Sequence, residues 1–458
     1  ARGLRHGRIA AKRRQARLVM SRILLAALAL MLVVQRSAAA VEVQRVVSPG
    51  GIEAWLVEEH TVPIVSLRFV FRGGSALDPD GKEGLAELAS GLLNEGAGEM
   101  DALAFQKALD DSVVRMGFKA GIDKFGGSLA TLTETGDVAY HLLAMALNEP
   151  RFDVDALERV RAQVIAGLER AARDGNEVAR QQWYVTAFAG HPYARPPGGT
   201  IAGVEAITRD DLLAFVRDRF GRDALIIGVA GDISAQDLGR MLDLVFADLP
   251  GEARPGDIPE TSPGAGGMVL VERLPQPQSA LLMGQVGLKR TDPRYYTAYV
   301  MNHIFGGGGF SSRLNMEVRE KRGLAYGIFS YLVPLDHAAS FMIGTATQNA
   351  RVSETLGVVR DEVTRLHDEG VSEEELTDAK TYLTGSFPLR LDSNGEIASI
   401  LVGMQVAELG IDYLDRRNGL IEAVTREDIA ALAAELLDPD GFAVVVVGEP
   451  EGIDATSQ

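Results

Sequence analysis

Residues 81–98, GKEGLAELASGLLNEGAG, predict a helix that begins after Gly84 and ends in a stretch broken by glycine. Helices of this kind often carry the ligands of a metalloenzyme. This one offers Glu87, Ser90 and Gly91. These three residues cannot hold a metal ion together, because zinc sites are built from three or four Cys, His, Asp or Glu side chains. The helix keeps an apolar face that can pack against a domain core, made of Leu85, Leu88, Leu92 and Leu93.

The rest of the sequence lacks the other common arrangements of catalytic residues. The seven histidines are His6, His60, His141, His191, His303, His337 and His367. No two of them stand three to five residues apart, whereas a zinc peptidase helix needs two imidazoles on one face. There is no cysteine and no G-x-S-x-G motif, which excludes a thiol nucleophile and the nucleophile elbow of many hydrolases. The run GGGGF at 306–310 lacks the G-K-[ST] of a phosphate-binding loop.

Residues 1–40 differ in composition from the rest of the sequence. They contain nine Lys and Arg and no acidic residue, with an apolar run at 23–34 and the small residues SAAA after it. This order is typical of a secretory signal peptide, and an uncleaved membrane anchor is the alternative. Removing the nine positive charges would change the formal net charge from −17 to −26, which argues against nucleic acid as a partner. We therefore expect a periplasmic protein with no stable membrane insertion after removal of the signal peptide.

Two pairs of similar segments indicate a duplication. Residues 206–232 resemble residues 423–450, and each segment has a Thr at the helix N-cap, an acidic first turn, an amphipathic helix and then an apolar strand. Residues 154–168 resemble residues 373–387, and both pairs are separated by about 218 residues. Equal separation favours duplication of a whole domain over a short-period repeat.

A Pro- and Gly-rich stretch between the two copies predicts an exposed linker. Both halves are expected to be α+β, because alternating strands such as PIVSLRFVF are mixed with long amphipathic helices such as VSETLGVVRDEVTRLHDEG. This mixture suits an antiparallel sheet covered by helices. The expected organisation is a signal peptide at 1–40, an N-terminal domain at 41–250, a linker at 251–266, a C-terminal domain at 267–450 and a tail at 451–458.

The sequence resembles the pitrilysin/insulinase family of zinc metallopeptidases, which includes the mitochondrial processing peptidase. The resemblance covers nearly all of the chain after residue 40. It rests on VSLRFVFRGGSALDPDGKEGLAELASGLL, on GGGGFSSRLNMEVREKRGLAYGI and on the tandem halves. The family's inverted motif H-x-x-E-H falls on Glu87, Ser90 and Gly91, and its third ligand falls near Gly167, with Glu169 as a weaker candidate. The resemblance thus implies no metal in this chain, with zinc expected in a partner subunit.

The resemblance assigns catalytic roles to Arg319 and Tyr326 in REKRGLAY. In the family, this pair reaches across a closed chamber to the zinc of the other half. There the tyrosine hydroxyl supports the developing oxyanion and the arginine orients the substrate backbone. A structural alternative also fits the residues, because Arg319 could be a favourable cation at a helix C-terminus that Gly323 caps. Tyr326 could then be an ordinary core aromatic.

Two further segments are expected to bind substrate by the same resemblance. The first is a glycine-rich loop formed by Gly306, Gly307, Gly308 and Gly309, for which a flexible connection is the alternative. The second is KFGGSLATLTE at 124–134, which corresponds to the family's edge strand and contains Gly127, Ser128 and Leu129. A sheet edge offers unpaired N–H and C=O groups to an extended peptide. The alternative is that the two glycines form a turn into a core strand.

We therefore expect two halves that form a clamshell around an unfolded peptide. The chain would be the metal-free subunit of a heterodimeric zinc endopeptidase, inactive alone, with a homologous partner that carries H-x-x-E-H. A non-enzymatic peptide-binding or scaffold role is the main alternative. An independent enzyme that uses Glu87 or Ser90 is a third possibility, although neither residue has a histidine near it in sequence.

Overall fold

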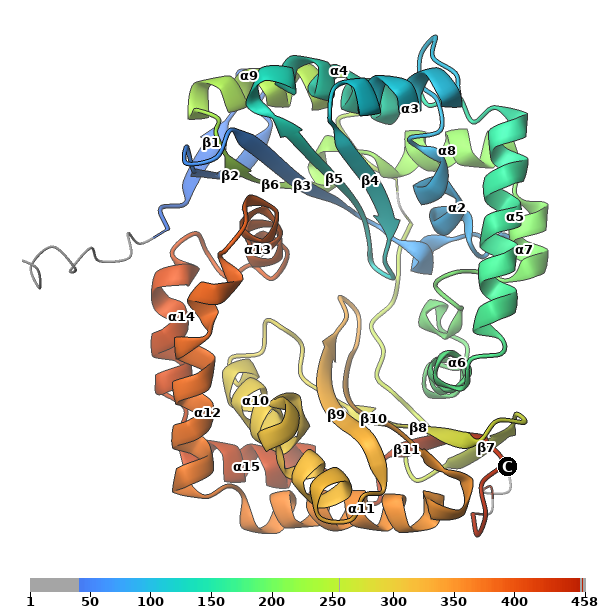
Figure 1. The fold of residues 1–458 in the computed structure, drawn as a ribbon, viewed down its shortest axis with the longest axis vertical. Helices are drawn as coiled ribbons and strands as arrows, with labels where there is room; N and C mark the ends of the chain where they lie inside the picture. Colours follow the sequence, from blue (N-terminus) through green and yellow to red (C-terminus); the bar gives the residue numbers. More distant parts are fainter. Residues whose placement is uncertain (1–40, 255, 454, 456–458) are drawn as a thin grey trace, which may run out of the picture. The chain divides into compact units, whose positions relative to one another are not determined.

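The computed structural model describes residues 41–254, 256–453 and 455, and two β-sheets form its frame (Figure 1). The predicted signal peptide lies outside the described residues. The first sheet has the strand order β1-β2-β6-β3-β5-β4. Its strands are β1 (Gln44–Val47), β2 (Glu53–Glu58), β3 (Ile64–Arg72), β4 (Arg115–Ala120), β5 (Lys124–Leu132) and β6 (Leu225–Gly231).

The second sheet has the order β7-β11-β8-β10-β9. Its strands are β7 (Val269–Arg273), β8 (Gln278–Val286), β9 (Ala325–Pro334), β10 (Ala339–Gln348) and β11 (Ala443–Gly448). The β2–β6 pair and the β7–β11 pair are parallel, and all other pairs are antiparallel. The expected α+β fold is therefore confirmed, but the prediction of purely antiparallel sheets is wrong. From β2 onwards, the first sheet has the same order and strand directions as the second.

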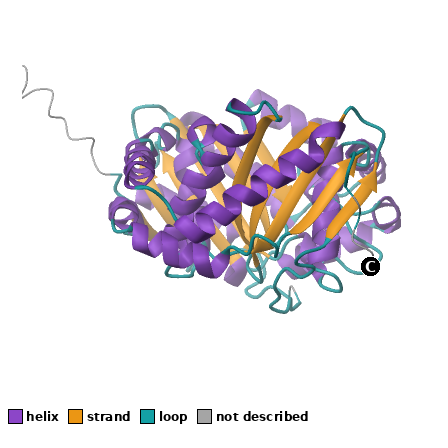
Figure 2. Ribbon diagram, turned by 90° about the horizontal axis from the view of Figure 1, so that it is seen from below, coloured by secondary structure: helices purple, strands orange, loops and turns teal. Residues whose placement is uncertain are grey.

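Helices fill the segments between the strands in both parts of the chain. Those before residue 250 are α2 (Leu85–Leu92), α3 (Ala102–Asp111), α4 (Gly136–Asn148), α5 (Val154–Ala171), α6 (Gly175–Ala187), α7 (Ile201–Ala206), α8 (Arg209–Arg219) and α9 (Ala235–Phe246). Those after it are α10 (Tyr295–Asn302), α11 (Val352–Glu369), α12 (Glu373–Gly385), α13 (Asn394–Val406), α14 (Tyr413–Glu422) and α15 (Arg426–Leu436). Figure 2 shows these helices lying across the strands. None of the described helices has the length and apolar character needed to cross a membrane.

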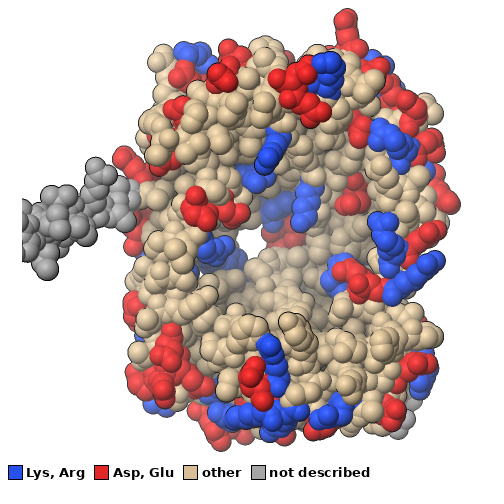
Figure 3. Space-filling view, viewed as in Figure 1, with Lys and Arg blue, Asp and Glu red and all other residues tan. Residues whose placement is uncertain are grey.

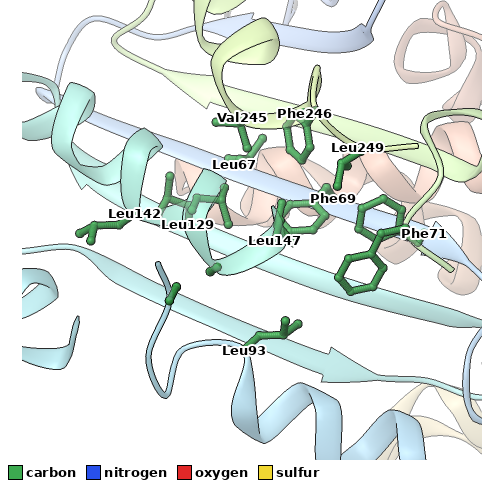
Figure 4. Close-up of a cluster of buried hydrophobic side chains, with 14 of the residues drawn as sticks. Leu67, Phe69, Phe71, Leu93, Leu129, Leu142, Leu147, Val245, Phe246 and Leu249 are labelled. Carbon is green, nitrogen blue, oxygen red and sulfur yellow. The ribbon is translucent and has the colours of Figure 1, made fainter. Parts of the chain in front are cut away.

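Each sheet packs one face against helices of its own half. Leu67, Phe69 and Phe71 of β3 point into a core shared with α4 and α9 (Figure 4). The Phe69 ring lies 5.5 Å from the Phe246 ring, edge to face, and aromatic pairs favour this arrangement. Alternate residues of β3 thus face the core, as the period of two in the sequence predicts.

Each half also lends one helix to the other half's sheet. Helix α13 packs on β6, where a β-carbon on Gly228 would lie 2.5 Å from the Ala398 carbonyl oxygen. Helix α6 packs on β8, where the ring of Trp183 fills the space beside Gly284. Glycine at both strand positions therefore lets a helix approach the sheet backbone closely. This exchange joins the two halves, and the chain from Val43 onwards forms one compact unit.

The predicted linker region contains no helix or strand in its described part, and it is largely exposed. It is nevertheless held against both halves. Ile258 is buried, and the backbone N–H of Thr261 donates to the His337 carbonyl at 2.9 Å. The N–H of Gly264 donates to the Ala187 carbonyl at 2.7 Å. The segment is therefore a docked connection, which the Pro and Gly content alone did not indicate.

Candidate functional site

Helix α2 begins at a buried ion pair that the sequence analysis did not identify. The Asp78 carboxylate accepts hydrogen bonds from the backbone N–H groups of Gly84 (3.1 Å) and Ala86 (3.2 Å). The Arg219 guanidinium of α8 lies 3.2 Å from the same carboxylate. Burial raises the pKa of Asp78, while the charge of Arg219 acts in the opposite direction. Since buried charges need partners, the pair and the left-handed Gly84 (φ 106°) fix the start of the helix.

A side chain at Gly91, which the resemblance matches to the family's second histidine, would press on a methyl group of Val160. Gly91 lies on α2 where this helix packs against α5, and a β-carbon on it would lie 2.8 Å from Cγ1 of Val160. Real β-carbons do not come so close to another carbon atom, because the protein interior is close-packed. Val160 belongs to the buried core of the first half. The space that an imidazole at position 91 would need is thus filled by α5.

The other positions of the degenerate motif do not make up for this loss. The Ser90 hydroxyl donates to the Glu87 carbonyl oxygen one turn earlier, at 2.8 Å. The Glu87 side chain is half-buried, and burial raises the pKa of its carboxyl. Gly167 on α5 has only the Arg170 guanidinium within 4 Å of a β-carbon position. No group of three His, Asp or Glu side chains in the described chain could hold a metal ion, so these residues do not fit zinc.

Arg319 and Tyr326 lie side by side, on either side of a tight turn. Arg319 belongs to the short π-helix η7 (Asn315–Glu320), and Tyr326 is at the start of β9. Gly323 between them has φ +58°, and its N–H donates to the Arg319 carbonyl at 2.9 Å. The expected glycine cap is thus confirmed. The guanidinium carbon lies 5.2 Å from the Tyr326 ring centre and 4.2 Å from that of Phe310, so two aromatic rings hold the cation.

The charge of Arg319 is largely uncommitted. Glu317 forms ion pairs with the two neighbouring cations, Lys321 at 2.5 Å and Arg322 at 2.6 Å. Arg319 itself has one carboxylate contact in the described residues, to Glu320 at 3.5 Å, and its buried Nη1 atom has no hydrogen-bond partner there. A buried donor without a partner is costly. The side chain as a whole is 26% exposed, so its accessible part can meet an acceptor from another molecule, whereas the buried Nη1 can do so only after a change of rotamer.

Tyr326 is not a core residue. Its side chain is 86% exposed on β9, the edge strand of the second sheet. Phe310, on the other side of Arg319, is 68% exposed. The Tyr326 hydroxyl makes no hydrogen bond within the described residues. The alternative of an ordinary packing aromatic is thus excluded, because such a residue would be buried.

The four glycines at 306–309 lie where two short helices meet, and Gly309 begins the 3-10 helix η6 (Gly309–Ser311). Gly306 and Gly307 are the last residues of the π-helix η5 (His303–Gly307), which follows directly after α10. Gly306 is buried, and a β-carbon there would lie 2.5 Å from the Ser330 hydroxyl oxygen of β9. Gly309 has φ +65° and open space around it. The run is thus neither a free loop nor a flexible connection over its whole length, because it packs α10 tightly against β9.

Strand β5, which contains the expected substrate-binding residues Gly127, Ser128 and Leu129, is not at the sheet edge. It pairs with β3 on one side and with β4 on the other. Leu129 is buried in the core, and the Phe69 ring occupies the space beside Gly127. The expectation of an edge strand is therefore wrong. The alternative of a core strand is confirmed, although the two glycines lie within the strand and not in a turn that leads to it. Strand β4 forms this edge, and a peptide that extends the sheet here would have to pair with β4.

A cavity of about 620 Å³ lies between the two halves. Its lining holds charged residues of both signs, namely Arg72, Lys124, Lys289 and Arg290 together with Asp123, Asp257, Asp336 and Glu408. In Figure 3 the molecule is hollowed at its centre, with side chains of both charges near the opening. One wall is closed by ion pairing between Lys124 and Asp336, at 2.6 Å. Because charges of both signs line this cavity, it offers hydrogen-bond donors and acceptors without favouring a ligand of one charge.

A buried cluster of polar groups beside this cavity joins the two halves through hydrogen bonds. The Tyr193 hydroxyl donates to Asp123 at 2.7 Å and accepts from the His337 backbone N–H at 3.0 Å. Asp123 also accepts from the backbone N–H of Asp336 at 2.9 Å. Burial and the nearby Asp123 raise the pKa of Tyr193, so the hydroxyl stays protonated. These residues are 70 to 213 positions apart in sequence, and no local pattern could have brought them together.

Comparisons with known proteins agree on one family. The profile described as the peptidase M16 inactive domain matches residues 206–383. The chain is similar to the non-peptidase homolog YmxG of Helicobacter pylori, with 30% identity over 73% of this chain and 77% of that protein. It is also similar to the probable mitochondrial-processing peptidase subunit beta of Schizosaccharomyces pombe, with 27% identity over 69% of this chain and 71% of that protein.

A solved structure extends the likeness to the whole fold. The peptidase M16 inactive domain from Pseudomonas fluorescens superimposes with a TM-score of 0.83 at 29% identity, over 91% of this chain and all of that chain. Its description agrees with the loss of every expected metal ligand at Glu87, Ser90, Gly91 and Gly167. From the matching profile, the relatives and the shared fold, we conclude that this chain belongs to the M16 family of pitrilysin-like and mitochondrial-processing-peptidase-like proteins, as a member of its inactive-domain type.

Proposed function

We propose that this chain is the metal-free subunit of a heteromeric M16 zinc endopeptidase, to which it contributes Arg319 and Tyr326. A related partner chain would contribute the H-x-x-E-H helix. The observation that carries the proposal is the exposed Tyr326 beside the Arg319 guanidinium, at 5.2 Å. Most of the Arg319 charge is left uncompensated in the described chain, because its one carboxylate contact there is Glu320 at 3.5 Å.

The two side chains suit the stabilisation of a peptide carbonyl. A guanidinium is always charged and donates through a fixed fork of N–H groups, so Arg319 can orient a peptide backbone. A tyrosine hydroxyl can donate to a carbonyl oxygen that gains negative charge. The Arg319 guanidinium packs on the rings of Phe310 and Tyr326. These contacts limit the rotamers of Arg319 and so lower the conformational entropy that its side chain loses when substrate binds.

The rest of the proposal concerns the peptide and its location. The strand order that the two sheets share from β2 onwards supports tandem homologous halves, which would form one side of a clamshell. The cavity between the halves, whose lining offers both donors and acceptors, is a suitable place for an extended peptide. The composition of residues 1–40 supports secretion to the periplasm. Gly309, with open space around it, is the glycine of the 306–309 run best placed to contact substrate.

The alternative is a non-enzymatic peptide-binding or scaffold protein of the same fold. The name of the H. pylori relative, a non-peptidase homolog, favours this alternative. The tight packing of Val160 against Gly91 fits both proposals, since both require a chain without zinc.

Co-expression of the full chain with an M16 chain that carries an intact H-x-x-E-H motif tests the proposal. We expect a stable complex that cleaves a fluorogenic peptide, whereas each chain alone cleaves it at least about a hundredfold more slowly. A zinc chelator should abolish the activity of the complex. A complex that shows no activity above that of the partner alone would contradict the enzymatic proposal and favour the scaffold.

A further inference from the structure

A second cavity, of about 320 Å³, lies within the second half and is lined by residues of α10, α13 and α14. It shares Arg290 and Gly403 with the larger cavity between the halves, so that the two spaces adjoin. Nothing in the family's degenerate zinc site or in the Arg319–Tyr326 pair involves this cavity.

The lining of this cavity has an excess of positive charge. Three arginines contribute to it, Arg290, Arg390 and Arg417, and one carboxylate, Glu396. None of the three forms an ion pair with a carboxylate in the described chain. This is unusual in a chain of formal net charge −17, where acidic partners are abundant. The excess therefore favours an anionic ligand.

Arg417 makes the strongest case, because it is buried. Arg417 is 4% exposed, and the central carbon of its guanidinium group lies 4.0 Å from the centre of the Phe387 ring. It donates to the Leu383 carbonyl and to the Asn418 side-chain oxygen, both at 3.1 Å. Both acceptors are neutral, so the charge itself has no counter-ion among the residues that the structure describes. A buried cation is costly unless an anion compensates for it.

Aromatic side chains form the walls around these cations. The Arg290 guanidinium lies 4.2 Å from the Tyr295 ring centre and 5.0 Å from that of Tyr296. It also donates to the Tyr296 hydroxyl at 2.8 Å. The Tyr413 ring lies 6.5 Å from the Tyr296 ring. The cavity thus combines fixed hydrogen-bond donors with apolar surface, as small-molecule sites do.

We propose that this cavity binds the C-terminal carboxylate of a peptide whose last side chain is apolar or aromatic. Guanidinium groups bind carboxylates through paired, charge-assisted hydrogen bonds. The aromatic walls give an apolar side chain a place to bury its surface, which a bare inorganic anion would leave unused. The volume is near the lower end of the range for ligand sites and suits one or two residues. The rest of the peptide can extend past Arg290 into the larger cavity.

This proposal goes beyond the proposed function, because it requires neither a partner subunit nor hydrolysis. The test is therefore made on the full chain alone, by isothermal titration calorimetry in phosphate-free buffer. The probes are the N-acetylated tripeptide Ala-Ala-Phe with a free carboxylate and the same tripeptide with a C-terminal amide. We expect the free acid to bind with a Kd of about 1 mM or below, and the amide to bind at least about tenfold more weakly.

Arg390→Gln is the decisive variant. Arg390 is exposed and has no ion pair in the described structure, so its loss should leave folding intact. We expect it to weaken binding of the acid about tenfold, with no change for the amide. The matched control is Arg360→Gln, another exposed arginine without an ion pair in that part of the chain, on α11 and outside the cavity. This control should bind like the unchanged protein, and thermal melting should confirm that both variants are folded.

The contrary outcomes are equally defined. Equal affinity for acid and amide, an equal effect of the two arginine variants, or no binding up to about 10 mM peptide would overturn the proposal. Displacement of the peptide by inorganic phosphate at the peptide's own Kd would also overturn it, because the site would then recognise a simple anion. None of these results bears on whether a partner chain supplies zinc.

Discussion

Cγ1 of Val160 lies 2.8 Å from the point that a β-carbon on Gly91 would occupy. Helix α5 therefore crowds α2 at the position that the resemblance matches to the second histidine of the zinc motif. In this chain the absence of a ligand at position 91 goes with a close neighbour at the same place. Restoring the ligands by substitution must then also restore the space.

The first prediction concerns that restoration. The triple variant Glu87→His, Ser90→Glu and Gly91→His should bind zinc weakly, and overpacking against Val160 should lower its free energy of unfolding by about 1–3 kcal/mol. Addition of Val160→Ala should recover part of this stability and raise zinc affinity. Urea unfolding and competition with a chelator measure the two effects. A triple variant that binds zinc tightly at unchanged stability would show that α5 does not limit this site.

A second prediction separates the function of Tyr326 from its packing. Because the side chain is 86% exposed, Tyr326→Phe should change the free energy of unfolding by less than about 0.5 kcal/mol. In an active complex it should lower turnover by about a hundredfold.

Tyr382→Phe is the matched control, since Tyr382 is also exposed and stacks on His303 through its ring alone. If both variants lower turnover equally, or neither does, Tyr326 has no particular role in the reaction.

A third prediction concerns the ion pair at the start of α2. Asp78→Ala would leave Arg219 buried without its carboxylate, and it should lower the free energy of unfolding by about 3–5 kcal/mol. Asp80→Ala is the control, because Asp80 is 92% exposed although it also contacts an arginine, Arg195, at 3.2 Å. The expected loss there is below about 1 kcal/mol. Similar urea midpoints for the two variants would contradict a structural role of the buried pair.

A fourth prediction concerns stability in acid. Burial alone would raise the pKa of Glu375. Hydrogen bonds from Arg313 at 2.6 and 2.7 Å, hydrogen bonds from Ser372 and the charge of Arg313 together outweigh burial and lower the pKa from 4.5 to about 2. A depressed pKa stabilises the folded state above the unfolded value, and this contribution is lost as the pH falls through the folded value. Between about pH 4.5 and pH 2, the unchanged protein should therefore lose stability more steeply than Glu375→Gln. Equal slopes of unfolding free energy against pH would contradict this assignment.

Elements with strong local signals were predicted well. Thr208 and Thr425 begin α8 and α15 with a complete capping box each, and the apolar runs that follow become β6 and β11. These signals need only a few neighbouring residues. The relation between Arg319, Gly323 and Tyr326 was likewise predictable, because a short turn fixes it.

Features that depend on distant segments were not predicted. The parallel pairing of Trp55 with Gly228 joins residues that are far apart in sequence, and it turned an expected antiparallel sheet into a mixed one. The place of β5 between β3 and β4 also depends on pairing partners that its own sequence does not name. The arginines around the small cavity are spread from Arg290 to Arg417, and no motif connects them.

Because α6 and α13 each pack on the sheet of the other half, the first sheet cannot be fully covered until part of the second half has been synthesised. The first sheet is complete once Gly231 has been made, but α13, which covers part of one of its faces, begins about 160 residues later. At a synthesis rate of roughly 5–20 residues per second, on the order of ten seconds pass between completion of the sheet and the start of α13. During this interval the nascent chain presents a sheet surface that other chains or chaperones can bind. The first half therefore completes the cover of its sheet only after much of the second half has been synthesised.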